Sequence, residues 1–261
     1  MLVFGPPSKA KQSGMTLIEL MIGLVVGLVV IGGALTLLLT SLNNQKSHNQ
    51  VVRLNQDMRA IMDLMVRDIR RAGFATDNPA SNASSLLANP FFVHTGASTT
   101  DLSIINTSTD SLTVLDGTGN CILYAYNRDY AGEVPPAVAN NERFGFLKEG
   151  DDVYIRVSGA SNSVSECDTS VASSEWYLMN SSVIEFINLE FEVSSDLYNA
   201  TTASTASGSC VDDDSCLIVR TVKVDMTARV EDEPALLQTL TETVRIRNDK
   251  FVASYASSSI N

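Results

Sequence analysis

The chain has 261 residues, and its 30 Asp and Glu residues against 18 Lys and Arg residues give a formal net charge of -12. That length is compatible with one globular domain plus an anchor, or with two small domains. An acidic balance disfavours nucleic acid and anionic lipid headgroups as partners of the globular part, because both carry negative charge.

The chain begins with a short basic leader that ends in a small residue. Lys9 and Lys11 precede Gly14, and an apolar run follows directly. The positive-inside rule places these lysines, and with them the amino terminus, in the cytoplasm. Everything after Leu42 is then expected on the other side of the membrane, so the sequence predicts a single-pass membrane protein with an exported head.

The stretch from Met15 to Leu42 predicts a membrane-spanning helix. It contains no Lys, Arg or Asp and a single acid, Glu19, while Leu20 to Leu39 is apolar or Gly except for Thr36. About 20 such residues match the hydrocarbon thickness of a bilayer. A charge near the end of such a helix is usually retained for a functional partner. A plain anchor whose Glu19 snorkels to the interface is the alternative, and a cleaved secretory peptide is disfavoured because the apolar run is too long.

The residues around this acid carry a family resemblance: Gly14, Met15, Thr16, Leu17, Ile18, Glu19 and Leu20. This segment resembles the class III signal of type IV pilins and of the pseudopilins of type II secretion, although those families usually show Phe where Met15 stands. In them a membrane-embedded aspartyl prepilin peptidase cuts after the Gly and methylates the new amino terminus. The resemblance implies cleavage between Gly14 and Met15 and N-methylation of Met15.

The acid at Glu19 then has an expected role in assembly. The free amine of a processed Met15 is cationic near neutral pH and Glu19 is anionic. Two parallel copies offset by about one helical turn could pair the amine of one with the carboxylate of the next. Such a pair is strong when complete and costly when broken in a medium of low dielectric constant. We therefore expect Glu19 to set the register of a helical polymer.

The helix is expected to continue past the membrane, from Thr16 to about Ala72. An apolar stripe at helical spacing marks this continuation, formed by Leu54, Met58, Ile61, Met62, Met65 and Ile69. We expect four parts: a leader over residues 1–14, a transmembrane and assembly half of a stalk helix over 15–42, an amphipathic half over 43–73, and a head over 74–261.

Within the head the apolar period changes to two, which predicts antiparallel strands with one buried and one wet face. The clearest strand runs from Val222 to Val230, and its hairpin partner contains Val244, across a turn at Glu231–Leu237. Shorter alternating segments surround Leu112, Ile155 and Phe191. The sequence therefore predicts an α+β fold in which the stalk helix packs on an antiparallel sheet.

Three segments without such alternation are rich in small polar residues, and we expect them to form loops. They are Ala75–Thr100, Gly159–Ser174 and Ser195–Ser215.

Four cysteines lie in the exported part: Cys121, Cys167, Cys210 and Cys216. An even number in an oxidising compartment predicts two disulfides, with three pairings open. We prefer Cys210 with Cys216, which closes a short loop and leaves Cys121 with Cys167. A zinc site is the rival, but the spacing lacks Cys-x-x-Cys pairs.

Further segments narrow the resemblance. Met58–Gly73 is similar to the post-membrane helix of PilW-type minor pilins and J-type minor pseudopilins, and Cys121–Tyr126, Val222–Val230 and Thr243–Asn248 are similar to PilW-type chains. The likeness implies a type IV pilin-like fold and a minor pilin that primes pilus assembly near the fibre tip. Implied partners are prepilin peptidase, other minor pilins, the major pilin, the inner-membrane assembly platform and a tip adhesin. The implied location is the inner membrane with a periplasmic head, and then the extracellular fibre.

Other classes of function have weaker support. A type II secretion pseudopilin shares the same anchor, whereas an adhesin would need clustered aromatics that the sequence does not display. An anchored hydrolase would need a catalytic constellation, yet the histidines are only His48 and His94. We expect no enzyme activity, cofactor or metal. Calcium at Asp212–Asp214 with Asp151–Asp152 is an alternative to a solvated acidic turn.

Overall fold

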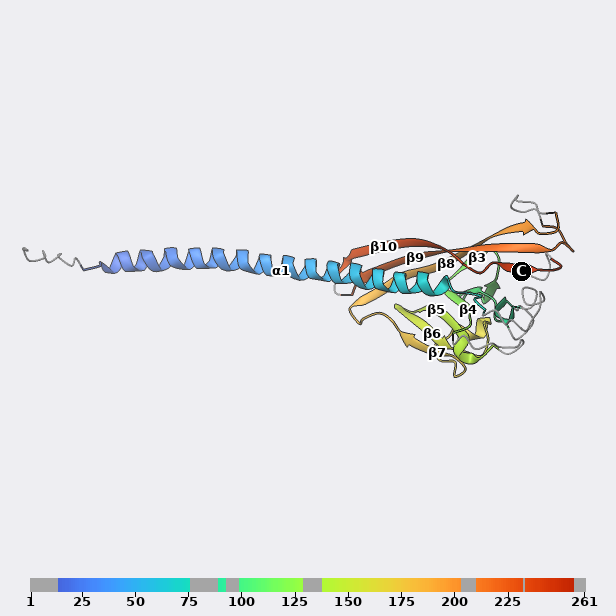
Figure 1. Cartoon of the computed structure of the whole chain (residues 1–261). Helices are drawn as coiled ribbons and strands as arrows, with labels where there is room; N and C mark the ends of the chain where they lie inside the picture. Colours follow the sequence, from blue (N-terminus) through green and yellow to red (C-terminus); the bar gives the residue numbers. More distant parts are fainter. Residues whose placement is uncertain are drawn as a thin grey trace, which may run out of the picture. The chain divides into compact units, whose positions relative to one another are not determined.

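The structure, a computed structural model, describes residues 14–75, 89–92, 99–128, 138–202, 210–231 and 233–255. The leader up to residue 13 lies outside the described residues, with its two lysines, and so does His94. The chain divides into two compact units, residues 1–50 and 51–261. The described elements give an α+β type IV pilin-like architecture of one long amino-terminal helix and antiparallel sheets (Figure 1).

The helix α1 runs from Leu17 to Ile69, close to the predicted span. It ends three residues before Ala72 because the chain turns at Gly73, whose φ of 74° is accessible to Gly at little cost. The Gly73 amide donates to the carbonyl of Ala125, and Asn248 donates to the carbonyl of Ala72. Two distant segments of the head therefore provide hydrogen-bond partners for backbone groups at the end of the helix.

The predicted apolar stripe is confirmed. The buried residues of α1 are Leu54, Met58, Ile61, Met62, Met65 and Ile69. They join one hydrophobic core with inward side chains from both sheets, such as Phe146 and Val224. Figure 1 shows β9 and β10 running alongside this second half of the helix.

One sheet has six strands in the order β2-β1-β4-β5-β6-β7, all paired antiparallel. They are β1 (Ser103–Asn106), β2 (Ser111–Thr113), β4 (Cys121–Ala125), β5 (Arg143–Glu149), β6 (Asp152–Ser158) and β7 (Glu175–Leu178). Short 3-10 turns lie at η2 (Pro90–Phe92), η3 (Asn140–Glu142) and η4 (Val164–Glu166).

The second sheet has the order β10-β9-β8-β3, with β11 also paired to β9. Its strands are β3 (Gly117–Gly119), β8 (Ile184–Asn199), β9 (Cys216–Val230), β10 (Glu233–Arg245) and β11 (Lys250–Val252). The ladder between β8 and β9 runs from Ile184 opposite Val230 to Asn199 opposite Cys216, with a register shift between Phe186 and Asn188. Burial alternates at every residue of β9, which confirms the alternation predicted for Val222–Val230 and extends it back to Cys216.

Two sheets stand where the sequence predicted one, and burial explains the difference. All five residues of β4 and the first five of β5 are buried, so neither strand has a wet face. A strand covered on both faces reads as a continuous apolar run rather than as an alternation. The central strands of the six-stranded sheet were for that reason invisible to a search for period two.

Two predicted boundaries were wrong. The loop expected from Ser195 begins only after Asn199, because Ser195 is held in the sheet: its amide donates to Asp116 and its hydroxyl to the carbonyl of Leu115. The hairpin turn expected over Glu231–Leu237 is shorter, since β10 begins at Glu233. A register shift between Glu233 and Leu237 absorbs the extra residues, and the pairing with β9 continues beyond it.

Candidate processing and assembly site

The predicted cleavage position lies just before α1. Gly14, Met15 and Thr16 are outside the helix and exposed, and a side chain built on Gly14 would meet no atom within 4 Å. From Gly14 onward, no described residue covers the peptide bond between Gly14 and Met15. Small size at Gly14 is not required by packing.

The first turn of α1 is capped by the residues of the signal. The Glu19 amide donates to the Thr16 hydroxyl at 3.3 Å, and that hydroxyl lies 3.5 Å from a Glu19 carboxylate oxygen. A threonine at the N-cap followed by a glutamate three residues later is the sequence of a capping box. The carboxylate also lies at the positive end of the helix dipole, which favours its charge. Glu19 thus has a local structural role beside any role in assembly.

The helical segment after this cap is apolar on every side. None of the residues from Gly14 to Gln50 is buried, and Met15, Leu17 and Ile18 are each at least two-thirds exposed. Within the described residues, α1 is the one helix long and apolar enough to cross a membrane. A helix that is hydrophobic all round needs an apolar environment, either lipid or other helices. Its first half has the length and composition of a single-pass membrane anchor.

Comparison with known families agrees with this geometry. Residues 9–35 match the family described as prokaryotic N-terminal methylation motif, and residues 47–246 match prepilin peptidase-dependent protein B. The chain belongs to the prepilin peptidase-dependent protein B family. No curated protein and no solved structure matches the chain significantly. The two families indicate a structural pilin-like protein that depends on prepilin peptidase, rather than an enzyme; they do not single out the PilW-type minor pilins.

The cysteines of this family member form two disulfides. Cys121, on the central strand β4, is joined to Cys167 with a Cα–Cα distance of 6.2 Å, and Cys210 is joined to Cys216 at 6.1 Å. These are the pairings preferred from the sequence. The chain-entropy relation gives about 4 kcal/mol for the longer loop and about 2.4 kcal/mol for the shorter one. Both bonds stabilise the head, and the four cysteines are paired with one another rather than arranged around a metal ion.

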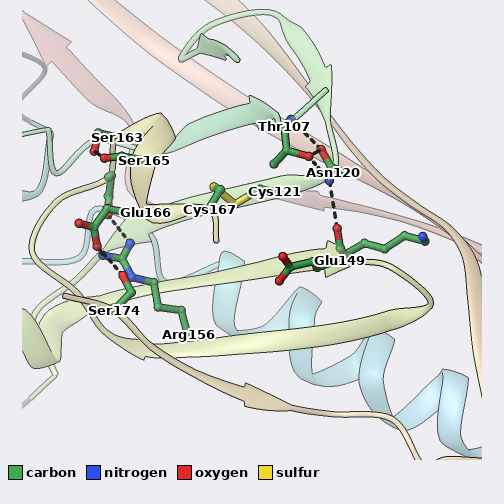
Figure 2. The surroundings of a disulfide bond; sticks show 12 residues. Thr107, Asn120, Cys121, Glu149, Arg156, Ser163, Ser165, Glu166, Cys167 and Ser174 are labelled. Atoms are coloured by element: carbon green, nitrogen blue, oxygen red, sulfur yellow. Dashed lines mark hydrogen bonds and ion pairs between the residues drawn. A yellow bond between two sulfur atoms is a disulfide. The ribbon is translucent and has the colours of Figure 1, made fainter. Parts of the chain in front are cut away.

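A buried ion pair accompanies the first disulfide (Figure 2). The Arg156 guanidinium lies 3.1 Å from a carboxylate oxygen of Glu166, and Ser174 also donates to Glu166. A Cβ at Gly159 would overlap the Arg156 guanidinium, so a larger residue there would displace this buried side chain. Burial lowers the pKa of Arg156 to about 10 and Glu166 counteracts this, so the side chain stays charged at neutral pH. This network fixes the loop predicted over Gly159–Ser174.

A second buried cluster was not found from the sequence. Asp101 is fully buried and accepts from Arg220 at 2.7 Å and from Lys250 at 2.6 Å. Burial by itself raises the pKa of Asp101, but Arg220 and then Lys250 outweigh it and hold the pKa below its usual value. The Arg220 guanidinium also lies 5.1 Å from the centre of the Phe92 ring. A lone Asp just after a segment predicted as a loop carries no signal of this role.

The remaining candidates do not assemble into a chemical site. Among the described residues no group of three or more His, Cys, Asp or Glu side chains could hold a metal ion. Asp214 instead accepts from Asn199 and from the Val211 amide, and Ser254 donates to Asp213, as expected of a hydrogen-bonded acidic turn. His48 is exposed on α1. The described part of the chain therefore holds a candidate processing segment and a disulfide-bonded head.

Proposed function

We propose that this chain is a minor pilin of a type IV pilus, which joins other minor pilins to prime assembly and lies near the fibre tip. The observation that carries the proposal is the segment Gly14–Glu19, an exposed and capped helix start that leads directly into an apolar helix half. Membership of a prepilin peptidase-dependent family supports it. The narrower likeness to PilW-type minor pilins points the same way.

The proposal includes a sequence of locations. The precursor sits in the inner membrane with its amino terminus in the cytoplasm and its head in the periplasm. Prepilin peptidase removes the leader after Gly14 and methylates Met15. The mature chain then leaves the bilayer for an extracellular fibre, where neighbouring helices replace lipid around the apolar half. Two disulfides in the head fit an oxidising compartment.

The charge and size of the head suggest that each fibre contains few copies of this chain. A major subunit must tile many copies of itself, whereas this chain carries a net charge of -12 and two separate sheets. Like charges on adjacent identical heads repel. We therefore propose few copies per fibre, assembled with the major pilin and other minor pilins through the pairing of Glu19 with a neighbour's methylated amine. The inner-membrane assembly platform and a tip adhesin are the further proposed partners.

The test combines a Glu19→Ala strain with mass spectrometry of membranes and sheared fibres. We expect the variant to begin at methylated Met15, as the wild type does, yet to be missing from fibres and to reduce piliation. Glu190→Ala is the matched control, because Glu190 is an exposed glutamate on the head. Gly14→Leu should leave the leader uncut.

Three outcomes would overturn the proposal. The first is normal piliation by the Glu19→Ala strain. The second is a wild-type chain that is the most abundant fibre subunit. The third is its recovery in a type II secretion pseudopilus instead of a pilus, which would make it a minor pseudopilin.

A further inference from the structure

A groove on the head is lined by positively charged residues, whereas the chain as a whole is negatively charged. It has a volume of about 1080 Å³ and lies beside the last turns of α1. Five arginines line it: Arg67, Arg70, Arg71, Arg128 and Arg247. In a chain with a formal charge of -12, this arginine groove is a local concentration of positive charge.

Two aspartates in the groove cancel only part of the charge of these arginines. Asp63 and Asp68 also line it, so five arginines less two aspartates leave a formal surplus of three positive charges. Asp63 is already paired with Arg67 at 2.5 Å. Asp68 accepts from the hydroxyls of Tyr124 and Tyr126 at 2.6 and 2.9 Å. Both acids are thus engaged within the fold.

Two of the arginines are held close together by the backbone. The Arg247 amide donates to the Arg70 carbonyl at 3.2 Å, which joins the segment after β10 to the end of α1. Both side chains are exposed, and within the described residues neither they nor Arg128 has a carboxylate partner. Both residues line the same groove, so an anion bound there would be attracted by two positive charges. Guanidinium groups match carboxylates in bidentate geometry, so carboxylates are suitable anions.

The groove also has an apolar side. Phe74, Phe144, Ile155 and Val157 line it, from the end of α1 and from strands β5 and β6. Its volume is at the upper end of what a small ligand fills. Arginines along an apolar surface suit an extended segment that alternates acidic with apolar side chains. An anionic bilayer would also face the acidic surface around the groove, whereas a short peptide fits inside the groove, which favours a short peptide over lipid.

We propose that the arginine groove binds a short acidic peptide segment of a partner protein, carrying two or more Asp or Glu residues beside an aromatic or branched apolar side chain. Carboxylates engage Arg70 and Arg247, and the apolar side chain contacts Phe144 and Ile155. This partner site goes beyond the proposed function, and it stands whether or not the chain enters a fibre.

Binding is measured on the full chain in dodecyl maltoside micelles, with fluorescein-labelled peptide Gly-Asp-Phe-Glu-Val-Asp-Gly followed by anisotropy. We expect saturable binding that weakens as salt rises, because exposed charges are screened. The amide counterpart Gly-Asn-Phe-Gln-Val-Asn-Gly should bind at least tenfold more weakly. The double variant Arg70→Gln with Arg247→Gln should lose about tenfold in affinity, and Lys at both positions should restore part of it.

Arg59→Gln is the matched control. Arg59 is exposed on the same helix, outside the groove, and has no ion pair within the described part of the chain. The Trp176 emission spectrum should be unchanged in all variants. Equal binding of the amide peptide, or equal loss in Arg59→Gln, would overturn the proposal. So would absence of binding, displacement of the peptide by phosphatidylglycerol but not by phosphatidylcholine, each added as mixed micelles with the detergent, or a chain dimer that the double variant dissociates.

Discussion

The two halves of α1 have the same backbone and opposite surroundings. Leu28 in the first half is 62% exposed, whereas Leu54 in the second half is 0% exposed. The first half has apolar side chains on all sides and none of its residues is buried, whereas the second half has a single apolar stripe that is entirely buried. The two halves therefore differ in how their apolar residues are arranged around the helix. Apolar residues on all sides indicate a helix that needs lipid or other helices around it, whereas a single apolar stripe indicates a helix that packs on its own core.

The same contrast holds for charge. Glu19, the one acid of the apolar half, is exposed and contacts only its own cap within the described residues. The acids of the head that matter for stability are buried and paired, as Asp101 is with two cations. We infer that the head and the second half of α1 account for the free energy of unfolding, and assembly is the role that we propose for the first half.

The largest expected effect comes from Asp101→Asn. The change leaves Arg220 and Lys250 buried without a compensating charge, and breaking a buried ionic group costs about 4 kcal/mol. Urea unfolding of the full chain in micelles, followed by the fluorescence of Trp176, measures the loss. Asp63→Asn, at an exposed pair on α1, should cost about 0.5 kcal/mol or less.

The difference in the free energy of unfolding between wild type and Asp101→Asn should also depend on pH. The folded-state pKa of Asp101 is held below the unfolded value of 3.8, so its stabilisation is complete above that pH and is lost as pH falls through the folded pKa. The gap between wild type and Asp101→Asn should therefore narrow below about pH 3.8. A gap that is constant down to acid pH would contradict the role of the charge.

A smaller effect tests the comparison of the two helix halves directly. Leu54→Ala should cost about 3 kcal/mol, because it leaves a cavity in a core that includes both sheets. Leu28→Ala, the same change on the same helix, should leave the unfolding of the head unchanged. The measurement is again urea unfolding reported by Trp176. Equal losses at the two positions would mean that the first half is part of the cooperative core, and the comparison would fail.

Periodic features could be predicted from the sequence, and features that depend on distant partners could not. The stripe ending at Ile69 and the strand from Val222 to Val230 repeat with a helical or a two-residue period, and burial follows that repeat. Strand β4 has no wet face and therefore no such repeat. The signal at Gly14 to Glu19 is local, so the candidate processing segment was visible in advance.

The buried charges and the arginine groove were not visible, because each is assembled from segments far apart in the chain. Asp101 meets Arg220 and Lys250 across more than a hundred residues. Arg70 and Arg247 are joined by a backbone hydrogen bond, although one lies at the end of α1 and the other after β10. Side chains of these types are ordinarily exposed, and composition alone assigns them to the surface.

The smallest expected effect comes from Tyr126→Phe, at the junction of the second half of α1 with the sheet. The Tyr126 hydroxyl donates to Asp68 at 2.9 Å, and a hydrogen bond to a charged group contributes about 1.5 kcal/mol. Tyr177→Phe is the matched control, because Tyr177 is 56% exposed on the edge strand β7 and should lose almost nothing. Urea unfolding followed by Trp176 measures both variants.

Alkaline pH sharpens this last test. Burial, and then the charge of Asp68, raises the pKa of Tyr126 above its usual value of 10.0. Above about pH 10 the unfolded chain loses the Tyr126 proton while the folded chain keeps it, so wild-type stability falls as pH rises toward the folded pKa. Phe does not titrate, and the gap between wild type and Tyr126→Phe should therefore close above pH 10. A gap that stays constant or widens there would show that the hydroxyl is not held against Asp68, and the second half of α1 would then be fixed to the head without this hydrogen bond.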